Sequence, residues 1–300
     1  MAGDRLVWER DGLDWPHREA SRFVQAGGLR WHVQRFGAAR RPAVLLLHGT
    51  GSSTHSWRGL APLLAEDFSV LSCDLPGHGF TDMPPAWQLS LPGMAQAVGA
   101  LLAALDSPPR LAIGHSAGAA IAARMCLDGH MAPAALISLN GAFLPLGGWA
   151  GQLFSPAAKL MAITPLVPQL FAWRAGDASV VQGLIDGTGS TLDAEGLALY
   201  GRLVRSPGHA AAALGMMAHW DLKPMLVDLP RLRPALTLVA AGNDRTIPPD
   251  HARRVQALLP SAQRIDLPGL GHLAHEERPA EVTELVLRVA REQRVVRQDG

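Results

Sequence analysis

The pentapeptide Gly114-His115-Ser116-Ala117-Gly118 is the place in the sequence where residue types and spacing most clearly suggest chemistry. It follows a short apolar run and precedes a series of small residues, so we predict a strand that ends at Ile113 and a helix that begins at Ala117. The pattern G-x-S-x-G between a strand and a helix is a nucleophile elbow, a sharp turn that exposes the serine hydroxyl. The alternative is a structural serine in a tight Gly-rich connection. We expect Ser116 to be a nucleophile.

A serine hydroxyl attacks only when a base takes its proton, and a carboxylate commonly orients that base. Asp244 follows a predicted strand in AAGNDRTIPPD, and His272 follows the last one in LPGLGHLAHEERP. The two are 28 residues apart, which leaves room for one helix and one strand between them. Asn140 occupies the position after the preceding strand and cannot supply a carboxylate, and we interpret Asp250 as a helix N-cap. We therefore expect a Ser116-Asp244-His272 triad.

His275 is the competing candidate for the base. It lies three residues after His272, in what the pattern predicts to be a helical turn, and we interpret it as a solvated or capping histidine. His272 is favoured because site residues project from loops just beyond strand ends. HLAHEE lacks the H-E-x-x-H spacing and a nearby third ligand, so we predict no metal site.

Backbone N–H groups must also stabilise the oxyanion of a tetrahedral intermediate. We expect one from Ala117, directly after the nucleophile, and one from Thr50 in the turn His48-Gly49-Thr50-Gly51. His48 is predicted to shape this turn through hydrogen bonds. Asp74, in the next Gly-rich turn, is predicted to organise loops rather than to attack substrate.

Strands and helices alternate along the chain. A hairpin is predicted at 21–37, with its turn at Gly27-Gly28. Further apolar runs, each ending in a turn, are predicted to be parallel strands, and they occupy 43–51, 69–79, 110–118, 134–143, 235–248 and 263–272. Helical patterns are found at 90–105, 116–127, 250–259 and 279–292. This order predicts an α/β fold with a doubly wound, mostly parallel sheet.

Residues 144–228 interrupt that alternation because they contain no β-type run. Ser155-Pro156 and Ser206-Pro207 have the pattern of helix starts, and 192–204 places apolar residues on one helical face. We predict a helical cap at 144–228, inserted over the carboxyl edge of the sheet, and a core formed by 1–143 and 229–300.

The predicted cap is rich in large apolar side chains, including Leu160, Met161 and Phe171, and contains no cluster of basic residues. Core packing explains many of these side chains, but together they favour a wide apolar pocket. The residues that we expect to bind substrate are Trp57, Phe154, Trp173, Met216, Met217 and Trp220. With no G-x-G-x-x-G or P-loop pattern, we expect no nucleotide cofactor.

Composition excludes several function classes. A formal net charge of +1 favours no nucleic-acid partner, and two cysteines cannot form a disulfide framework. The N-terminal residues show no secretory signal, and no apolar run reaches the roughly 18 residues of a membrane span. We expect a cytoplasmic protein.

In these motifs the chain resembles the α/β-hydrolase superfamily. LLLHGTG, DLPGHGFTD, GHSAG, GNDRTIP and GLGHLAHEERP match in order over about 43–279. A serine at the elbow sets the chain apart from the haloalkane-dehalogenase and epoxide-hydrolase branches, which have an aspartate there. A finer resemblance, carried by HGTGSSTHSWR, LNGAFLPLGG and ALGMMAHWDL among others, is to the magnesium-chelatase accessory proteins of bacteriochlorophyll synthesis. It implies a photosynthetic bacterium, a tetrapyrrole connection, transient contact with magnesium chelatase and a place near the photosynthetic membrane.

Our leading hypothesis is a cofactor-independent serine hydrolase acting on an ester of an apolar small molecule, which the resemblance extends to a tetrapyrrole. The first alternative is a non-catalytic porphyrin-binding accessory protein on a hydrolase scaffold. The second is thioester or C–C hydrolysis by the same residues, because the catalytic set does not separate these reactions.

Overall fold

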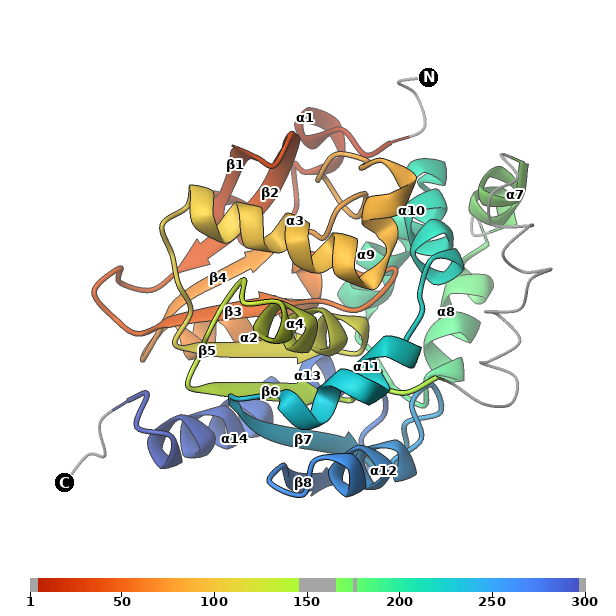
Figure 1. The fold of residues 1–300 in the computed structure, drawn as a ribbon. Helices are drawn as coiled ribbons and strands as arrows, with labels where there is room; N and C mark the ends of the chain where they lie inside the picture. The colour runs from red at the N-terminus through yellow and green to blue at the C-terminus, as the bar shows by residue number, and fades with distance from the viewer. Residues whose placement is uncertain (1–4, 146–165, 175–176, 297–300) are drawn as a thin grey trace.

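The computed structural model describes residues 5–145, 166–174 and 177–296. In this part of the chain, the apolar runs form one eight-stranded sheet, whose order is β1-β2-β4-β3-β5-β6-β7-β8 (Figure 1). β2 is antiparallel to β1 and β4, and the other neighbouring pairs are parallel. The strands are β1 Ser21–Ala26, β2 Leu29–Phe36, β3 Ala43–Leu47, β4 Ser69–Cys73, β5 Leu111–His115, β6 Ala135–Leu139, β7 Ala235–Ala241 and β8 Gln263–Leu267.

The predicted hairpin is confirmed. Ala26 pairs with Leu29 across a two-residue turn, and both turn residues have positive φ, 57° at Gly27 and 80° at Gly28. Two consecutive left-handed residues are what a tight hairpin turn needs to match the twist of its strands, and glycine adopts them without steric cost.

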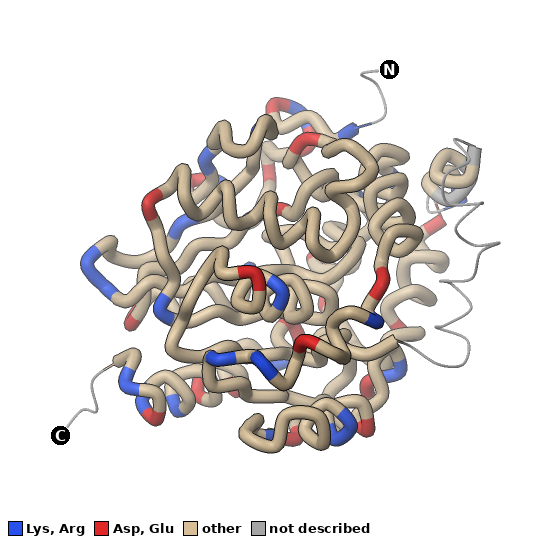
Figure 2. Tube along the Cα trace, in the orientation of Figure 1, with Lys and Arg blue, Asp and Glu red and all other residues tan. Residues whose placement is uncertain are grey.

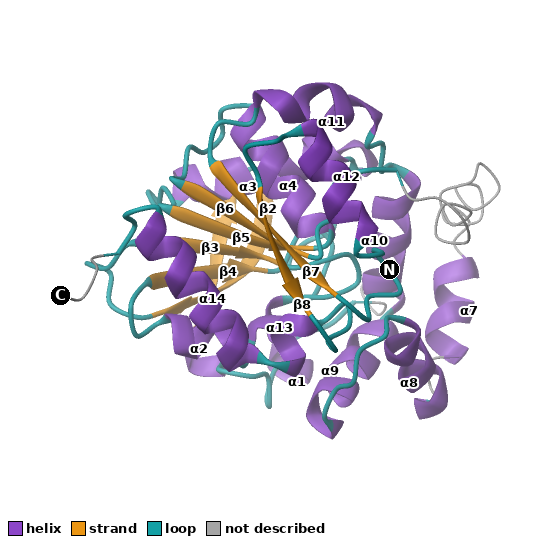
Figure 3. Ribbon diagram, turned by 90° about the horizontal axis from the view of Figure 1, so that it is seen from below, coloured by secondary structure: helices purple, strands orange, loops and turns teal. Residues whose placement is uncertain are grey.

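Alternate residues of each central strand pack against helices on opposite faces. In β3, Leu45 and Leu47 join one buried cluster, and Val44 and Leu46 join the other. The first cluster includes side chains of α3 (Leu91–Ala104), α4 (Ala117–Leu127), α11 (Lys223–Asp228) and α12 (Asp250–Leu258). The second includes side chains of α2 (Leu60–Leu64), α13 (Ala274–Glu277) and α14 (Pro279–Glu292). Figure 3 shows these helices on the two sides of the sheet, which confirms the doubly wound α/β fold.

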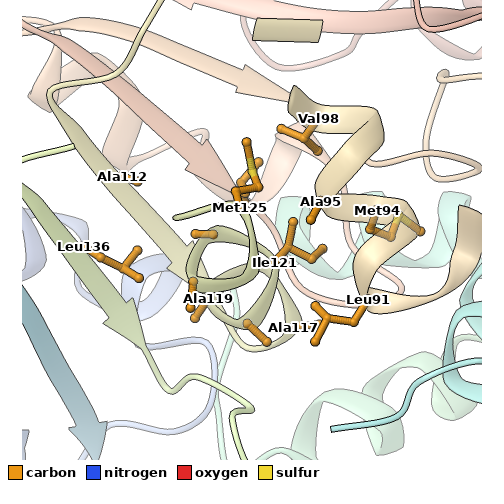
Figure 4. Packing of buried hydrophobic residues seen from close by; sticks show 14 of the residues in the cluster. Leu91, Met94, Ala95, Val98, Ala112, Ala117, Ala119, Ile121, Met125 and Leu136 are labelled. Atoms are coloured by element: carbon orange, nitrogen blue, oxygen red, sulfur yellow. The ribbon is translucent and has the colours of Figure 1, made fainter. Parts of the chain in front are cut away.

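Small residues let α4 lie close to its neighbours. Ile121 of α4 faces α3, where Met94 and Ala95 lie, and Ala119 lies on the side of α4 toward Leu136 of β6 (Figure 4). Ala119 and Ile121 are fully buried, and burial of apolar area at about 25 cal/mol per Å² is the main term that stabilises such a contact. The packing fixes the helix that starts directly after Ser116.

Helices fill the described part of the chain between β6 and β7. They are α7 Leu166–Arg174, α8 Ala178–Gly187, α9 Ala194–Val204, α10 Pro207–Ala218 and α11. Ser206 caps α10 as predicted, accepting from the His209 N–H, whereas Ser155 lies outside the described residues. Helices α7 to α10 lie beyond the carboxyl ends of the strands (Figure 3). In contrast, Met225 of α11 packs into the core cluster, so the division at residue 228 stays a prediction.

The remaining short elements are α1 (Trp8–Asp11) and the 3₁₀ helices η1 Arg18–Ala20, η2 Thr54–Trp57, η3 Ala86–Leu89 and η4 Leu229–Arg231. The N-cap prediction for Asp250 is wrong by one position: Pro249 is the N-cap of α12, and the Asp250 carboxylate pairs with Arg253. Acidic and basic residues are interspersed along the trace, without a large block of one sign in this view (Figure 2). Among the described residues, no helix combines the length and apolar character needed to cross a membrane.

The thiols of Cys73 and Cys126 are both free. Cys73 is buried and Cys126 is half-buried, and burial raises the pKa of both thiols, that of Cys126 to about 12. Both therefore stay protonated at neutral pH and act as apolar packing groups.

Candidate active site

Ser116 occupies a strained turn between β5 and α4. Its φ of 52° and ψ of −118° are rare for a residue with a side chain, and such strain persists only where the surroundings enforce it. The Ser116 N–H donates to the Leu139 carbonyl at 3.0 Å, and the Ser116 carbonyl accepts from the Ala142 N–H at 3.1 Å. A Cβ at Gly118 would lie 2.1 Å from the Leu47 carbonyl oxygen, so only glycine fits there. The predicted strand–turn–helix context is therefore present.

Asp244 lies in the loop after β7 and accepts four hydrogen bonds. Its Oδ1 accepts from the backbone N–H of Thr246 at 2.7 Å and of Ile247 at 2.8 Å. Its Oδ2 accepts from Asn140 Nδ2 at 2.5 Å and from His272 Nδ1 at 2.7 Å. The carboxylate is fully buried and can only accept, so the proton of a neutral His272 lies on Nδ1. The Nε2 lone pair of His272 is then able to take a proton from a hydroxyl.

Asn140 is a residue of this site whose part the sequence did not reveal. The sequence showed only that it could not be the acid, whereas the structure makes it a donor to Asp244. Its φ of 51° turns the chain after β6, and the asparagine side chain tolerates this left-handed conformation better than most. The usable signal was its position after a strand that neighbours β7.

His115 supports the loop that carries His272. Its Nε2 donates to the His272 carbonyl at 2.9 Å, and the two rings are 4.6 Å apart. The backbone N–H of His272 donates to the Thr188 carbonyl at 3.3 Å. Ser116 and His272 line the same cavity, so the ends of β5, β7 and β8 bring the predicted nucleophile, acid and base to one place.

The interpretation of His275 as a solvated or capping residue is wrong. Its side chain is buried between Trp57 and His115, with ring distances of 4.6 Å and 4.5 Å. Burial, together with the nearby charges of His272 and Arg58, lowers the pKa of His275 to about 3, so it is neutral. The expectation that Trp57 contacts substrate is also wrong, because its side chain is fully buried against His275 and does not line the cavity.

The turn at residues 49–52, which we call the oxyanion loop, lies beside Ser116. A Cβ at Gly49 would be 3.1 Å from Ser116 Cβ, and the Ser52 N–H closes the turn by donating to the Gly49 carbonyl at 3.2 Å. Within the described residues, the Thr50 N–H donates no hydrogen bond. Ala117 is the first residue of α4, whose N-terminal N–H groups favour negative charge. Thr50 and Ala117 both line the cavity.

His48 and Asp74 hold the loops around the site. His48 Nδ1 donates to the Gly49 carbonyl at 2.8 Å, and its Nε2 accepts from the Leu75 N–H at 2.9 Å. The Asp74 carboxylate, fully buried, accepts from Thr54 N, Phe80 N and His32 Nδ1. Burial opposes its ionisation, but His32, His48 and the donated hydrogen bonds lower the pKa of Asp74 well below its usual range. Their hydrogen bonds agree with the structural roles predicted for both residues.

The cavity above Ser116 has a volume of about 730 Å³ and is mostly apolar. Met217 and Trp220 line it as predicted. Met216 does not, because it is fully buried beneath the wall, where its sulfur accepts the Thr50 hydroxyl at 3.5 Å. Trp173 is 75% exposed and also lies outside the lining, and Phe154 falls outside the described residues.

The cavity also contains residues to which the sequence gave no site role. They include three polar residues, Tyr200 of α9, His209 of α10 and Lys223 at the start of α11. The periodicity of apolar residues predicts which side of a helix faces inward, but not which residues on that side reach the site. The sequence therefore predicted the apolar face of α9 but no site role for Tyr200. Over the described ranges, no group of three His, Cys, Asp or Glu side chains is arranged to hold a metal ion.

Comparison with known proteins agrees with this architecture. The chain is 35% identical over 263 residues to the magnesium-chelatase 30 kDa subunit of Rhodobacter capsulatus, covering 88% of this chain and 92% of that protein. It is 30% identical over 259 residues to the pimeloyl-[acyl-carrier protein] methyl ester esterase of Methylococcus capsulatus, covering 81% and 93%. An alpha/beta hydrolase fold protein from Burkholderia ambifaria superposes with a TM-score of 0.76 at 24% identity, covering 90% and 97%. Residues 44–285 match the sequence profile of the Alpha/beta hydrolase family, and the chain belongs to that family.

Proposed function

We propose that the protein is a serine hydrolase that cleaves a carboxylic ester of an apolar small molecule. The observation that carries the proposal is the buried Asp244–His272 pair, joined at 2.7 Å, at a cavity that Ser116 also lines. Burying a carboxylate and straining the backbone of a serine both cost free energy of folding. Packing alone gives no reason to maintain the two at one cavity.

In the proposed reaction, Ser116 Oγ attacks the ester carbonyl carbon while His272 Nε2 takes the hydroxyl proton. The resulting oxyanion is held by the N–H groups of Thr50 and Ala117. The tetrahedral intermediate then collapses, and His272 gives its proton to the departing alkoxide, which leaves as an alcohol while the acyl group stays on Ser116. Water attacks this acyl group, His272 takes one of its protons, and the carboxylic acid leaves as the proton returns to Ser116.

The cavity supports an apolar substrate with a large acyl or alcohol part. Its volume of about 730 Å³ falls in the range of sites for drug-sized ligands, about 300–1,000 Å³. The methyl ester esterase among the relatives supports an ester over a thioester or a C–C bond. A series of chromogenic esters of increasing acyl length checks the preference, with kcat/KM expected to rise for the longer chains.

A fluorophosphonate probe, followed by mass spectrometry, tests the nucleophile. We expect one adduct on Ser116 in the folded protein, and none in Ser116→Ala or in heat-denatured protein. His272→Ala should lower kcat by about 10⁴-fold or more, because the serine loses its base. Ser107→Ala, in the connection between α3 and β5, is the matched control and should leave labelling unchanged. Folded wild-type protein that forms no Ser116 adduct would contradict the proposal.

The relative from Rhodobacter capsulatus favours a second candidate, a non-catalytic accessory role beside a magnesium chelatase. It also supports the predicted contact with that enzyme, and the link to bacteriochlorophyll synthesis stays a prediction. Absorbance titration with a porphyrin distinguishes the two functions. Equal porphyrin binding and chelatase stimulation by wild type and Ser116→Ala would favour the accessory role, whereas loss of the pathway effect in Ser116→Ala would favour hydrolysis.

A further inference from the structure

Three side chains of the cap helices contact the oxyanion loop. His209 of α10 bonds the Gly51 carbonyl at 3.0 Å, and Tyr200 of α9 lies 3.3 Å from Ser52 Oγ through its hydroxyl. Thr50 Oγ1 donates to the sulfur of Met216, also on α10, at 3.5 Å. Each of residues 50, 51 and 52 therefore contacts a side chain of α9 or α10, although the loop itself follows strand β3 of the sheet.

The bond from His209 has a fixed direction. Gly79 N–H donates to His209 Nδ1 at 3.0 Å, so this nitrogen must be the acceptor. Nε2 then carries the proton of the neutral ring and donates it to the Gly51 carbonyl. Burial lowers the pKa of His209 to about 4, so the ring is neutral at neutral pH and keeps this single arrangement.

The bond acts on the residue that shapes the oxyanion loop. Gly51 is the third residue of the turn closed by Ser52 N–H and Gly49 O, and its φ is 76°. Glycine at that position is free to leave the left-handed region, which would reorient the peptides on either side. A donor on the Gly51 carbonyl opposes that movement. Thr50, whose N–H lacks a protein partner in the described residues, precedes Gly51 directly.

We propose that His209 is a positioning residue for the oxyanion hole, through which docking of cap helix α10 sets the geometry of Thr50. The proposal rests on the proposed hydrolase function and adds a coupling between the cap and the catalytic step. His209 lines the cavity, but it acts through the loop and exchanges no proton with substrate.

Two substitutions separate the bonds of His209. In His209→Asn the side-chain oxygen replaces Nδ1 as acceptor for Gly79, and the shorter side chain no longer reaches Gly51. In His209→Gln the amide nitrogen reaches the position of Nε2 and still donates to Gly51. His219→Gln is the matched control. His219 is the C-cap residue of α10, its side chain bonds the Gly215 carbonyl and no other group of the described residues, and it does not line the cavity.

We expect His209→Asn to lower kcat by about 10- to 100-fold with KM changed less than about threefold, since loss of a whole oxyanion donor costs about 10²–10³. The kcat of His209→Gln should stay within about fivefold of the wild-type value, and the kcat of His219→Gln should equal the wild-type value. Hydrogen exchange of the peptide covering 48–53 should be faster in His209→Asn than in His209→Gln. If the asparagine variant does not fold, His209→Met, similar in bulk but without a donor, replaces it.

The outcomes separate the two proposals. If wild type neither hydrolyses esters nor reacts at Ser116, the proposed function is wrong, and hydrogen exchange alone decides whether His209 holds the loop. If wild type is active and His209→Asn retains wild-type kcat, or if the asparagine and glutamine variants are equally impaired, the positioning role of His209 is wrong. An effect on KM alone would mean that His209 is only part of the cavity wall.

Discussion

Asp244 illustrates how much a catalytic carboxylate depends on residues that touch no substrate. Two backbone N–H groups fix one of its oxygens, while Asn140 and His272 share the other. Burial would make an isolated carboxylate costly, and four donors offset that cost. The position of Asp244 after a strand was readable from sequence. The donor from Asn140 was not, because it depends on β6 and β7 being neighbours.

Replacing Asn140 with glycine removes this donor while keeping the left-handed backbone. We expect Asn140→Gly to lose roughly 1.5–3 kcal/mol of stability, the value of a hydrogen bond to a charged group, and to lower kcat. Urea unfolding and ester hydrolysis measure the two effects. The role assigned to Asn140 is wrong if both stay at the wild-type value.

At the scale of elements, the elbow depends on how closely α4 approaches β3. Gly118 lies where any side chain would collide with the Leu47 carbonyl, and α3 holds α4 in place from the other side. The strain at Ser116 is thus maintained by helix packing. It is not a property of the pentapeptide alone.

A pair of glycine substitutions tests this dependence. Gly118→Ala should destabilise the protein by at least about 3 kcal/mol, because backbone atoms must move to admit the Cβ. Gly183→Ala, in helix α8, where no atom of the described residues lies within 4 Å of the added Cβ, should stabilise it by about 0.5–1 kcal/mol. Thermal and urea unfolding provide both numbers. Equal effects of the two changes would mean that the elbow is not tightly packed.

The elements were predictable where a local pattern dominates. Strand ends, the hairpin and the helix after Ser116 follow from apolar runs and turn residues, and the sheet confirms them. The predictions for Trp57, Met216 and His275 were wrong for one reason: only tertiary packing decides which way each side chain points. Trp57 and His275 lie in helices of four residues, which are too short for a periodic pattern, and Met216 lies in α10 beside Met217, which does line the cavity.

On the scale of the whole molecule, a buried polar network joins the cap to the core. Glu276 of α13 accepts from Tyr200 of α9 at 2.7 Å and pairs with Arg58 at 2.8 Å, and Arg58 also pairs with Asp193 at 2.7 Å. The Glu276 side chain is fully buried, and burial raises its pKa to about 7, although Tyr200 and Arg58 partly oppose the shift.

This network predicts a pH-dependent stability. The folded protein binds the Glu276 proton more tightly than the unfolded chain, so the contribution of Glu276 to the free energy of unfolding falls as pH rises from 4.5 to about 7. Glu276→Gln removes this loss. The stability of the variant relative to wild type should therefore increase between about pH 5 and about pH 8, by about 1.4 kcal/mol for each pKa unit of difference. Glu281→Gln, at an exposed position of α14, is the control.

Urea unfolding at several pH values measures the difference between the two proteins. A difference that is the same at every pH would show that Glu276 is not held protonated by the fold.

The chain enters and leaves the predicted cap at the same cavity. Ala142 and Pro145 line it after β6, and Trp220 and Leu222 line it before the return to β7 through α11. The described residues on both sides of this insertion therefore meet at one edge of the sheet, and doubling the length of a flexible insertion costs only about 0.6 kcal/mol of chain entropy. We therefore expect the chain-entropy cost of an insertion of another length at this point to be small. A new cap, however, would have to supply its own replacement for His209.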